Sequence, residues 1–210
     1  TNATHSGEVT GATALTIADN IVDEANLKVS NAPTNGHMLT AQSSNTGGMT
    51  WAAASGGITH ACKFRKTAET AGDQDPVTGW EVVDTYSYSG IGTAVSESSG
   101  TFSFPVTGIW HVSFKGFMYM NGDSSWNNII INTTTDNSSY GLHSYSSTLL
   151  QTTSSASGFG NATAEVMFDC TDVSTHKIKF QADFNNDSTT LSGDTGVDKV
   201  TATFVRLGDT

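Results

Sequence analysis

Six side chains in two short stretches of the sequence have the chemistry of a sugar-binding surface. Asn and Asp bond hydroxyl groups through planar amides and carboxylates, and a Trp ring stacks on the face of a pyranose. Taken one at a time, these residues are better explained by solvated turns or, for the Trp, by a place in the core. As a group they predict a binding surface, formed by Asn121, Asp123, Trp126, Asn185, Asn186 and Asp187.

Two of the polar stretches also contain potential ligands for a metal ion. Residues 185–187 and 194–198 are rich in Asn and Asp, and Ca²⁺ takes about six to eight oxygen ligands. Ordinary Asx turns explain both stretches better. The six His are scattered without the spacing of a zinc site. We therefore predict no cofactor and no metal site, with Ca²⁺ kept as an alternative, and we expect His111 on a surface or interface strand.

Carboxylates that could act as an acid/base pair are available, but the sequence does not single out any pair. Glycosidases use two carboxylates, and any acidic chain offers candidates, here Glu81, Asp84, Glu97, Glu165 and Asp169. A Gly-x-Ser-x-Gly elbow, a phosphate-binding loop and a Cys/His arrangement are all absent from the sequence. We predict no catalytic residues and no enzyme activity.

The composition restricts the partners of this chain. The 210 residues include 20 Asp and Glu against 9 Lys and Arg, which gives a formal net charge of −11 at pH 7. Such a surface repels phosphates, so we expect no binding to nucleic acid or to anionic membranes. No apolar stretch reaches the roughly 20 residues of a membrane span, so we expect no membrane insertion. Neutral glycans and cations remain open as partners.

The first part of the chain, residues 1–57, has little that could form a core by itself. Its short apolar islands are separated by Gly, Asn and Ala. Residues 16–29 are predicted as at most one short helix, which is marginal in water unless other copies bury it. We therefore expect an extended, intertwined shaft. Because the chain starts at Thr1 without an initiator Met, we also expect it to be a piece of a longer protein.

The second part, residues 58–210, has the pattern of β-strands at regular intervals. Trp110, Val112 and Phe114 alternate with polar neighbours, as strand residues facing a core do. Cys62 and Cys170 lie in such strands, so we expect reduced, buried thiols, with a disulfide as the alternative. The predicted strands are residues 61–66, 80–88, 101–104, 109–120, 126–132, 140–145, 164–170, 177–184 and 200–207.

These strands predict an all-β, two-sheet sandwich, for which a jelly roll is one standard arrangement. If successive strands are antiparallel, their connections alternate between the two ends of the sandwich. Loops 105–108, 133–139 and 172–176 then lie at one end, with the shaft and the C-terminus. Loops 67–79, 121–125, 150–160 and 185–198 lie at the other end, which brings the six candidate binding residues together.

Residues 100–114 resemble the signature of complement-type globular heads, which belong to the tumour-necrosis-factor-like jelly-roll superfamily. Gly100, Pro105 and Gly108 stand at the family's Gly and Pro positions, and Phe102 and Trp110 at its Phe and aromatic positions. The resemblance implies a complement/TNF-like jelly roll over about the last 150 residues. A Trp replaces the family's usual Tyr at position 110, and no collagen-like stalk precedes the head, so we carry over no immune function.

Residues 7–11, 15–19, 29–36 and 39–51 resemble the shaft repeats of tail fibres from marine and T-even-like phages. This resemblance implies a homotrimeric virion fibre, assembled in the bacterial cytoplasm, with the jelly roll as a knob that points outward. We expect the knob to bind a host cell-surface glycan or an outer-membrane protein. The part that precedes Thr1 is expected to bind other virion proteins.

Two further hypotheses remain open from the sequence. One is a structural capsid or neck decoration fibre, in which the knob serves as a trimerisation clamp. The other is a glycan depolymerase, which ranks third because no catalytic motif supports it.

Overall fold

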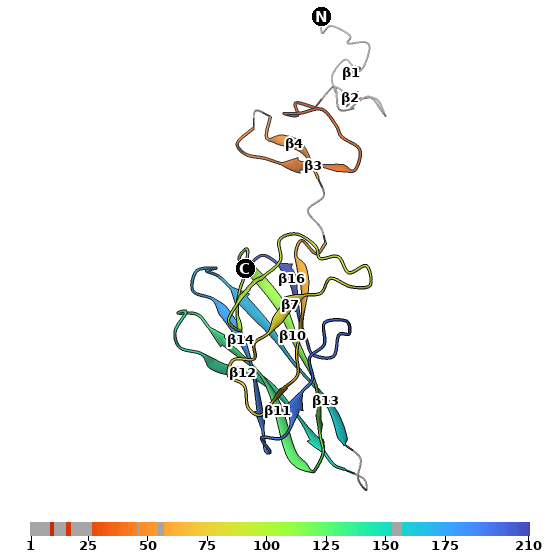
Figure 1. Ribbon diagram of the computed structural model, residues 1–210. Coiled ribbons are helices and arrows are strands. Elements are labelled where there is room, and N and C mark those ends of the chain that lie inside the picture. The colour runs from red at the N-terminus through yellow and green to blue at the C-terminus, as the bar shows by residue number, and fades with distance from the viewer. Residues whose placement is uncertain (1–8, 11–15, 18–26, 46, 54–56, 153–156) are drawn as a thin grey trace, which may run out of the picture. The chain divides into compact units, whose positions relative to one another are not determined.

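The computed structural model describes residues 9–10, 16–17, 27–45, 47–53, 57–152 and 157–210 (Figure 1). The chain divides into two compact units, residues 1–56 and residues 57–210. All the secondary structure in the described residues is β-strand. A bilayer-crossing helix is accordingly not found in this part of the chain.

Unit 1 contains two small strand pairs. β1 (Val9–Thr10) pairs antiparallel with β2 (Thr16–Ile17), and β3 (His37–Ala41) pairs antiparallel with β4 (Met49–Ala53). The Asn31 amide fastens the preceding chain to β4: its Nδ2 donates to the Trp51 carbonyl at 2.8 Å, and its Oδ1 accepts from the Trp51 N–H at 2.8 Å.

The expected helix at residues 16–29 is wrong at its start, because Thr16 and Ile17 are extended and bond to Val9 and Thr10. Residues 18–26 lie outside the described part of the chain. The intertwined shaft remains a prediction.

Unit 2 is a sandwich of two antiparallel sheets (Figure 1). In sheet 1 the order is β6-β15-β10-β16-β5-β7, with β13 also paired to β10; sheet 2 has the order β12-β11-β14-β9-β8. The strands of sheet 1 are β5 (Ala61–Lys66), β6 (Thr70–Ala71), β7 (Trp80–Val82), β10 (Gly108–Met120), β13 (Gly158–Cys170), β15 (Thr190–Leu191) and β16 (Thr201–Gly208). Those of sheet 2 are β8 (Ser96–Ser98), β9 (Thr101–Ser103), β11 (Ser124–Thr134), β12 (Gly141–Leu150) and β14 (Lys177–Phe184).

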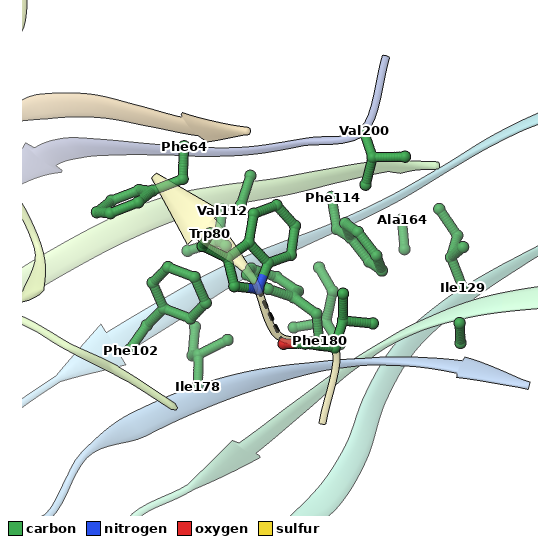
Figure 2. Close-up of a cluster of buried hydrophobic side chains, with 14 of the residues drawn as sticks. Phe64, Trp80, Phe102, Val112, Phe114, Ile129, Ala164, Ile178, Phe180 and Val200 are labelled. Atoms are coloured by element: carbon green, nitrogen blue, oxygen red, sulfur yellow. Dashed lines mark hydrogen bonds between the residues drawn. The ribbon is translucent and has the colours of Figure 1, made fainter. Parts of the chain in front are cut away.

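Aromatic rings fill the space between the two sheets (Figure 2). The Phe114 and Phe180 ring centroids are 4.7 Å apart, and Trp80 meets Phe102 edge to face at 5.7 Å. Trp80 is buried together with its polar group, because its Nε1–H donates to the Val77 carbonyl at 2.9 Å. Interdigitated rings of this kind give a dense interior that fixes how the sheets stack.

The alternation predicted for β10 is confirmed, since Trp110, Val112 and Phe114 all face the core. Cys62 and Cys170 are free and buried, as expected. Burial raises the pKa of the Cys170 thiol to about 11, so this side chain is a neutral thiol at pH 7.

One expectation about the strands is wrong, and three short strands were missed. The strand predicted for residues 80–88 ends at Val82, because Tyr86 and Ser87 have φ angles of 55° and 59° and form a turn closed by the Tyr88 N–H on the Thr85 carbonyl at 3.2 Å. The very short strands β6, β8 and β15 were not predicted. A run of two or three residues is too short to show a strand periodicity.

The register assigns the loops of unit 2 to its two ends. At the near end, Gly108 pairs with Cys170, and Arg206 bonds to Thr59 and His60, so the start of the unit and the C-terminal strand meet there. At the far end lie the last residue of β10 and the first of β11. This arrangement confirms the predicted loop assignment, except that residues 194–198 lie beside β5, where the Asp194 N–H donates to the Lys66 carbonyl at 2.8 Å.

Candidate functional site

The turn between β10 and β11 contains Asn121 and Asp123, both exposed at the far end. The Asp123 carboxylate accepts from the Thr152 N–H at 2.8 Å and from the Thr152 hydroxyl at 3.0 Å. These bonds favour the charged form and lower the pKa of Asp123. They also join this turn to the loop after β12.

Trp126 lies at the start of β11, and its side chain is 40% exposed. The alternative that placed this Trp in the core is therefore wrong. The Trp126 carbonyl accepts from the Asn185 N–H at 3.0 Å, and the Asn185 Oδ1 accepts from the Ser125 N–H at 3.1 Å. Asn185 thus fixes the end of β14 against the start of β11.

Asn186 and Asp187 form the tip of the loop between β14 and β15. The Asn186 Oδ1 accepts from the Ser188 N–H at 2.9 Å, which confirms the expected Asx turn. The Gly72 N–H donates to the Thr189 carbonyl at 2.9 Å, so this tip is also held to the loop before β7. The Asp187 side chain is exposed.

The structure therefore brings all six predicted residues to the far end, but it divides them by task. Asp123 and Asn185 use their side-chain oxygens to hold loops together. Asn121, Trp126 and Asp187 are exposed and offer an amide, an indole face and a carboxylate to a ligand. The far end thus has turns that are held by hydrogen bonds and that carry polar groups on their surface. Recognition sites commonly have these features.

Residues 194–198, the second stretch considered for Ca²⁺, form another Asx turn. The Asp194 Oδ1 accepts from the Gly196 N–H at 2.8 Å and from the Val197 N–H at 3.2 Å. Within the described ranges, no group of three His, Cys, Asp or Glu side chains is placed to hold a metal ion.

An ion-pair cluster around Arg65 was not predicted from the sequence. The Arg65 side chain is 1% exposed, and it donates to Glu81 Oε1 at 2.7 Å, Asp84 Oδ1 at 2.5 Å and Thr85 Oγ1 at 2.7 Å. Asp198 stands 3.9 Å from the same guanidinium. Glu81 and Asp84, two of the candidate catalytic carboxylates, are therefore partners of one cation and do not form an acid/base pair.

The outward face of sheet 1 has exposed apolar side chains on β13 and half-buried ones, such as Phe117, on β10. Phe159 is 64% exposed and Met167 is 55% exposed. The Phe117 and Phe159 rings stack at 5.9 Å with an interplanar angle of 11°. Between these apolar groups, His111 Nε2 lies 3.9 Å from Glu165 Oε1. The sequence contains a sign of this surface, because Phe159 and Met167 alternate with core residues along β13.

No known protein family matches this chain, and no curated protein matches it. Solved structures share its fold at low sequence identity. The Eiger TNF of S. frugiperda is 11% identical with a TM-score of 0.54, over 71% of this chain and 93% of that chain. Unit 2 has a TNF-like jelly-roll fold. Murine APRIL at pH 5.0 is also similar, with 11% identity and a TM-score of 0.50, over 70% of this chain and 98% of that chain.

The TNF-like likeness confirms the jelly roll expected from residues 100–114. At 11% sequence identity, the likeness shows a shared fold and says nothing about the partners of this chain. The function of this jelly roll therefore has to be argued from its own surfaces.

Proposed function

We propose that unit 2 is the knob of a homotrimeric bacteriophage fibre that attaches the virion to a receptor on the host cell surface, with a glycan favoured. The far-end loops are the observation that carries this proposal. They are bonded to one another, present Asn121, Trp126 and Asp187, and lie opposite the end where the chain enters unit 2. The phage-like strings in residues 7–51 support the assignment to a virion fibre.

The face of β10 and β13 is the surface that three copies share in this proposal. Phe159, Met167 and Leu207 are each more than half exposed on strands of sheet 1. Phe117 and Phe159 stack on this face at 5.9 Å, and apolar groups that gather on one face support a contact with another chain. A head-to-tail contact that closes on itself forms a ring of identical copies, and a ring of three leaves the far-end loops free. Three weak sites then gain avidity by binding one cell surface together.

An adsorption competition tests this function. Purified chain, confirmed as a trimer by its mass in solution, is added to host cells before the phage that carries this protein, and free virions are counted. The expected result is that the wild-type trimer blocks adsorption. An Asn121→Ala, Asp187→Ala variant is expected to block less, whereas the near-end control Val173→Ala blocks like wild type.

No blocking at saturating concentrations of correctly trimeric protein overturns attachment. That outcome supports the second candidate, a structural decoration fibre whose knob acts as a trimerisation clamp, because the apolar face of β10 and β13 serves that role equally well. Shortening of host polysaccharide during the incubation would instead support a depolymerase.

A further inference from the structure

The outward face of sheet 2 differs in chemistry from that of sheet 1. Along β11, alternate side chains face away from the core, beginning with Trp126 and Asn128. The residues between them, Asn127 and Ile129, are fully buried. The outward row thus begins with an aromatic ring and an amide and continues with Ile130, which its neighbours cover to 5% exposure.

β12 and β14, the strands on either side of β11, add further side chains to the same face. The register places Ser147 of β12 and Asp183 of β14 on either side of Asn128. One row along β11, Tyr145 and Gln181 flank Ile130. We call this surface the β11 strip and define it as Trp126, Asn128, Tyr145, Ser147, Gln181 and Asp183.

The β11 strip presents two aromatic rings separated by hydrogen-bonding groups. Trp126 is 40% exposed and Tyr145 is 62% exposed. Tyr145 pairs with Ile130, which is four positions after Trp126 on β11. The two rows are therefore about 14 Å apart at a strand rise of ~3.4 Å per residue. This length suits a short oligosaccharide better than a single ring, because each end of the ligand then meets one aromatic face.

The polar groups between the rings are placed to bond hydroxyls. The side chains of Asn128, Ser147 and Asp183 lie in one row across the three strands. Gln181 accepts from Asn132 Nδ2 at 2.9 Å, which orients its amide and leaves its own N–H groups for a ligand. The nearby cation, Lys179, is paired with Asp75 at 2.7 Å. With Asp183 in the strip and a net charge of −11, the match is to an uncharged ligand.

We propose that the β11 strip binds an uncharged oligosaccharide that lies along β11. Trp126 and Tyr145 stack on two of its rings, and Asn128, Gln181 and Asp183 bond its hydroxyls. The inference rests on the proposed attachment function and names its ligand class. It extends the receptor contact from the far-end loops up the side of the knob, with Trp126 belonging to both. A protein partner would instead favour an apolar centre in this patch.

The test measures binding of the full chain to neutral and uronic-acid-containing oligosaccharides cut from the host's own surface polysaccharide. Neutral fragments are expected to bind, and Tyr145→Ala and Trp126→Ala are each expected to weaken binding about tenfold, with Tyr145→Phe close to wild type. The matched control is Tyr86→Ala, because Tyr86 is 88% exposed on the loop after β7 and lies outside the strip. Ligand binding should also shift the Trp fluorescence in wild type but not in Trp126→Phe.

Two outcomes separate this inference from the proposed function. If wild-type trimer blocks phage adsorption while both alanine variants bind the fragments like wild type, the strip is overturned and attachment stands. Blocking of adsorption without any binding of neutral fragments also overturns the strip. If the trimer blocks no adsorption, attachment itself fails, whatever the fragments do.

Discussion

At the scale of single residues, Arg65 shows how a charge in a β-strand can organise loops. Its side chain faces away from the core, but the segments with Glu81, Asp84 and Asp198 cover it until only 1% is exposed. Lys63 completes the cluster through a 2.6 Å contact with Asp198. These carboxylates offset the cost of burying the Arg65 charge, so the cluster holds residues 81–84 and Asp198 against β5.

Removing one carboxylate from this cluster leaves the Arg65 guanidinium short of a partner. We expect Glu81→Ala to lower the Tm of unit 2 by several degrees, because the remaining charge stays covered. The measurement is thermal unfolding followed by circular dichroism. The double variant Arg65→Met, Glu81→Leu should regain part of the loss, since it removes the charge as well. Equal Tm values for Glu81→Ala and wild type would show that the cluster adds nothing to stability.

Asp136, at the near end, makes a pH-dependent contribution to the stability of the fold. Its Oδ1 accepts from the Thr134 hydroxyl at 2.7 Å and from the Ser138 and Ser139 N–H groups at 2.9 and 2.7 Å. These bonds favour the carboxylate and hold the pKa of Asp136 far below its ordinary value. A carboxyl with a lowered folded-state pKa stabilises the fold above its unfolded pKa of about 4, and this stabilisation is lost as the pH falls.

We therefore expect the Tm difference between wild type and Asp136→Ala to be largest near pH 6 and to shrink below about pH 4. Thermal unfolding at a series of pH values between 2 and 7 checks this. Asp187→Ala, which removes an exposed carboxylate on a different loop, is the control and should show little pH-dependent difference. A gap that stays constant down to pH 2 would contradict the assigned role.

At the scale of elements, strands of both sheets alternate buried residues with outward-facing ones, but the outward-facing residues differ between the sheets. β13 buries Ala164, Val166 and Phe168 and exposes the residues between them, including Met167. β11 buries Ile129 and Ile131 and turns Asn128 outward. In the proposals above, the outward face of sheet 1 contacts other copies and the outward face of sheet 2 binds a polar ligand.

The proposed contact on the face of β10 and β13 makes the trimer depend on Phe159 and Met167. Phe159→Ser, Met167→Ser should shift the chain from trimer towards monomer, because it replaces exposed apolar groups at the proposed contact. Light scattering at matched concentrations measures the mass. Val197→Ser is the control, since Val197 is 53% exposed on a loop outside this face. A double variant that remains fully trimeric would place the contact elsewhere.

The sequence predicted where the longer strands lie, although β12 and β13 extend beyond the expected 140–145 and 164–170, and it missed the very short strands. β5 and β14 match residues 61–66 and 177–184, where apolar alternation is regular. The strand at residues 80–88 was extended too far because the Tyr86 and Ser87 turn contains no Gly or Pro to mark it. Antiparallel phasing brought the candidate residues to one end. It could not predict that Asp123 and Asn185 hold loops, since that depends on contacts with Thr152 and Ser125.

At the scale of the whole molecule, the hydrophobic core identified in the described residues lies within unit 2, from Cys62 to Phe204. We expect a chain limited to residues 57–210 to keep its strand content and to unfold cooperatively, because its core is complete without unit 1. Circular dichroism and calorimetry check this, with the full chain as the control. Loss of cooperative unfolding in the shorter chain would show that unit 1 supplies part of the stability.

The position of β16 also determines when unit 2 can fold. β16 lies between β5 and β10, and it bonds to Cys62 and Phe64 on one side and to Val112 and Phe114 on the other. During synthesis, β5 and β10 leave the ribosome long before β16 and have no strand between them. Sheet 1 is therefore completed only after translation of residues 201–208, and until then the nascent chain has two unpaired strand edges, which favour aggregation.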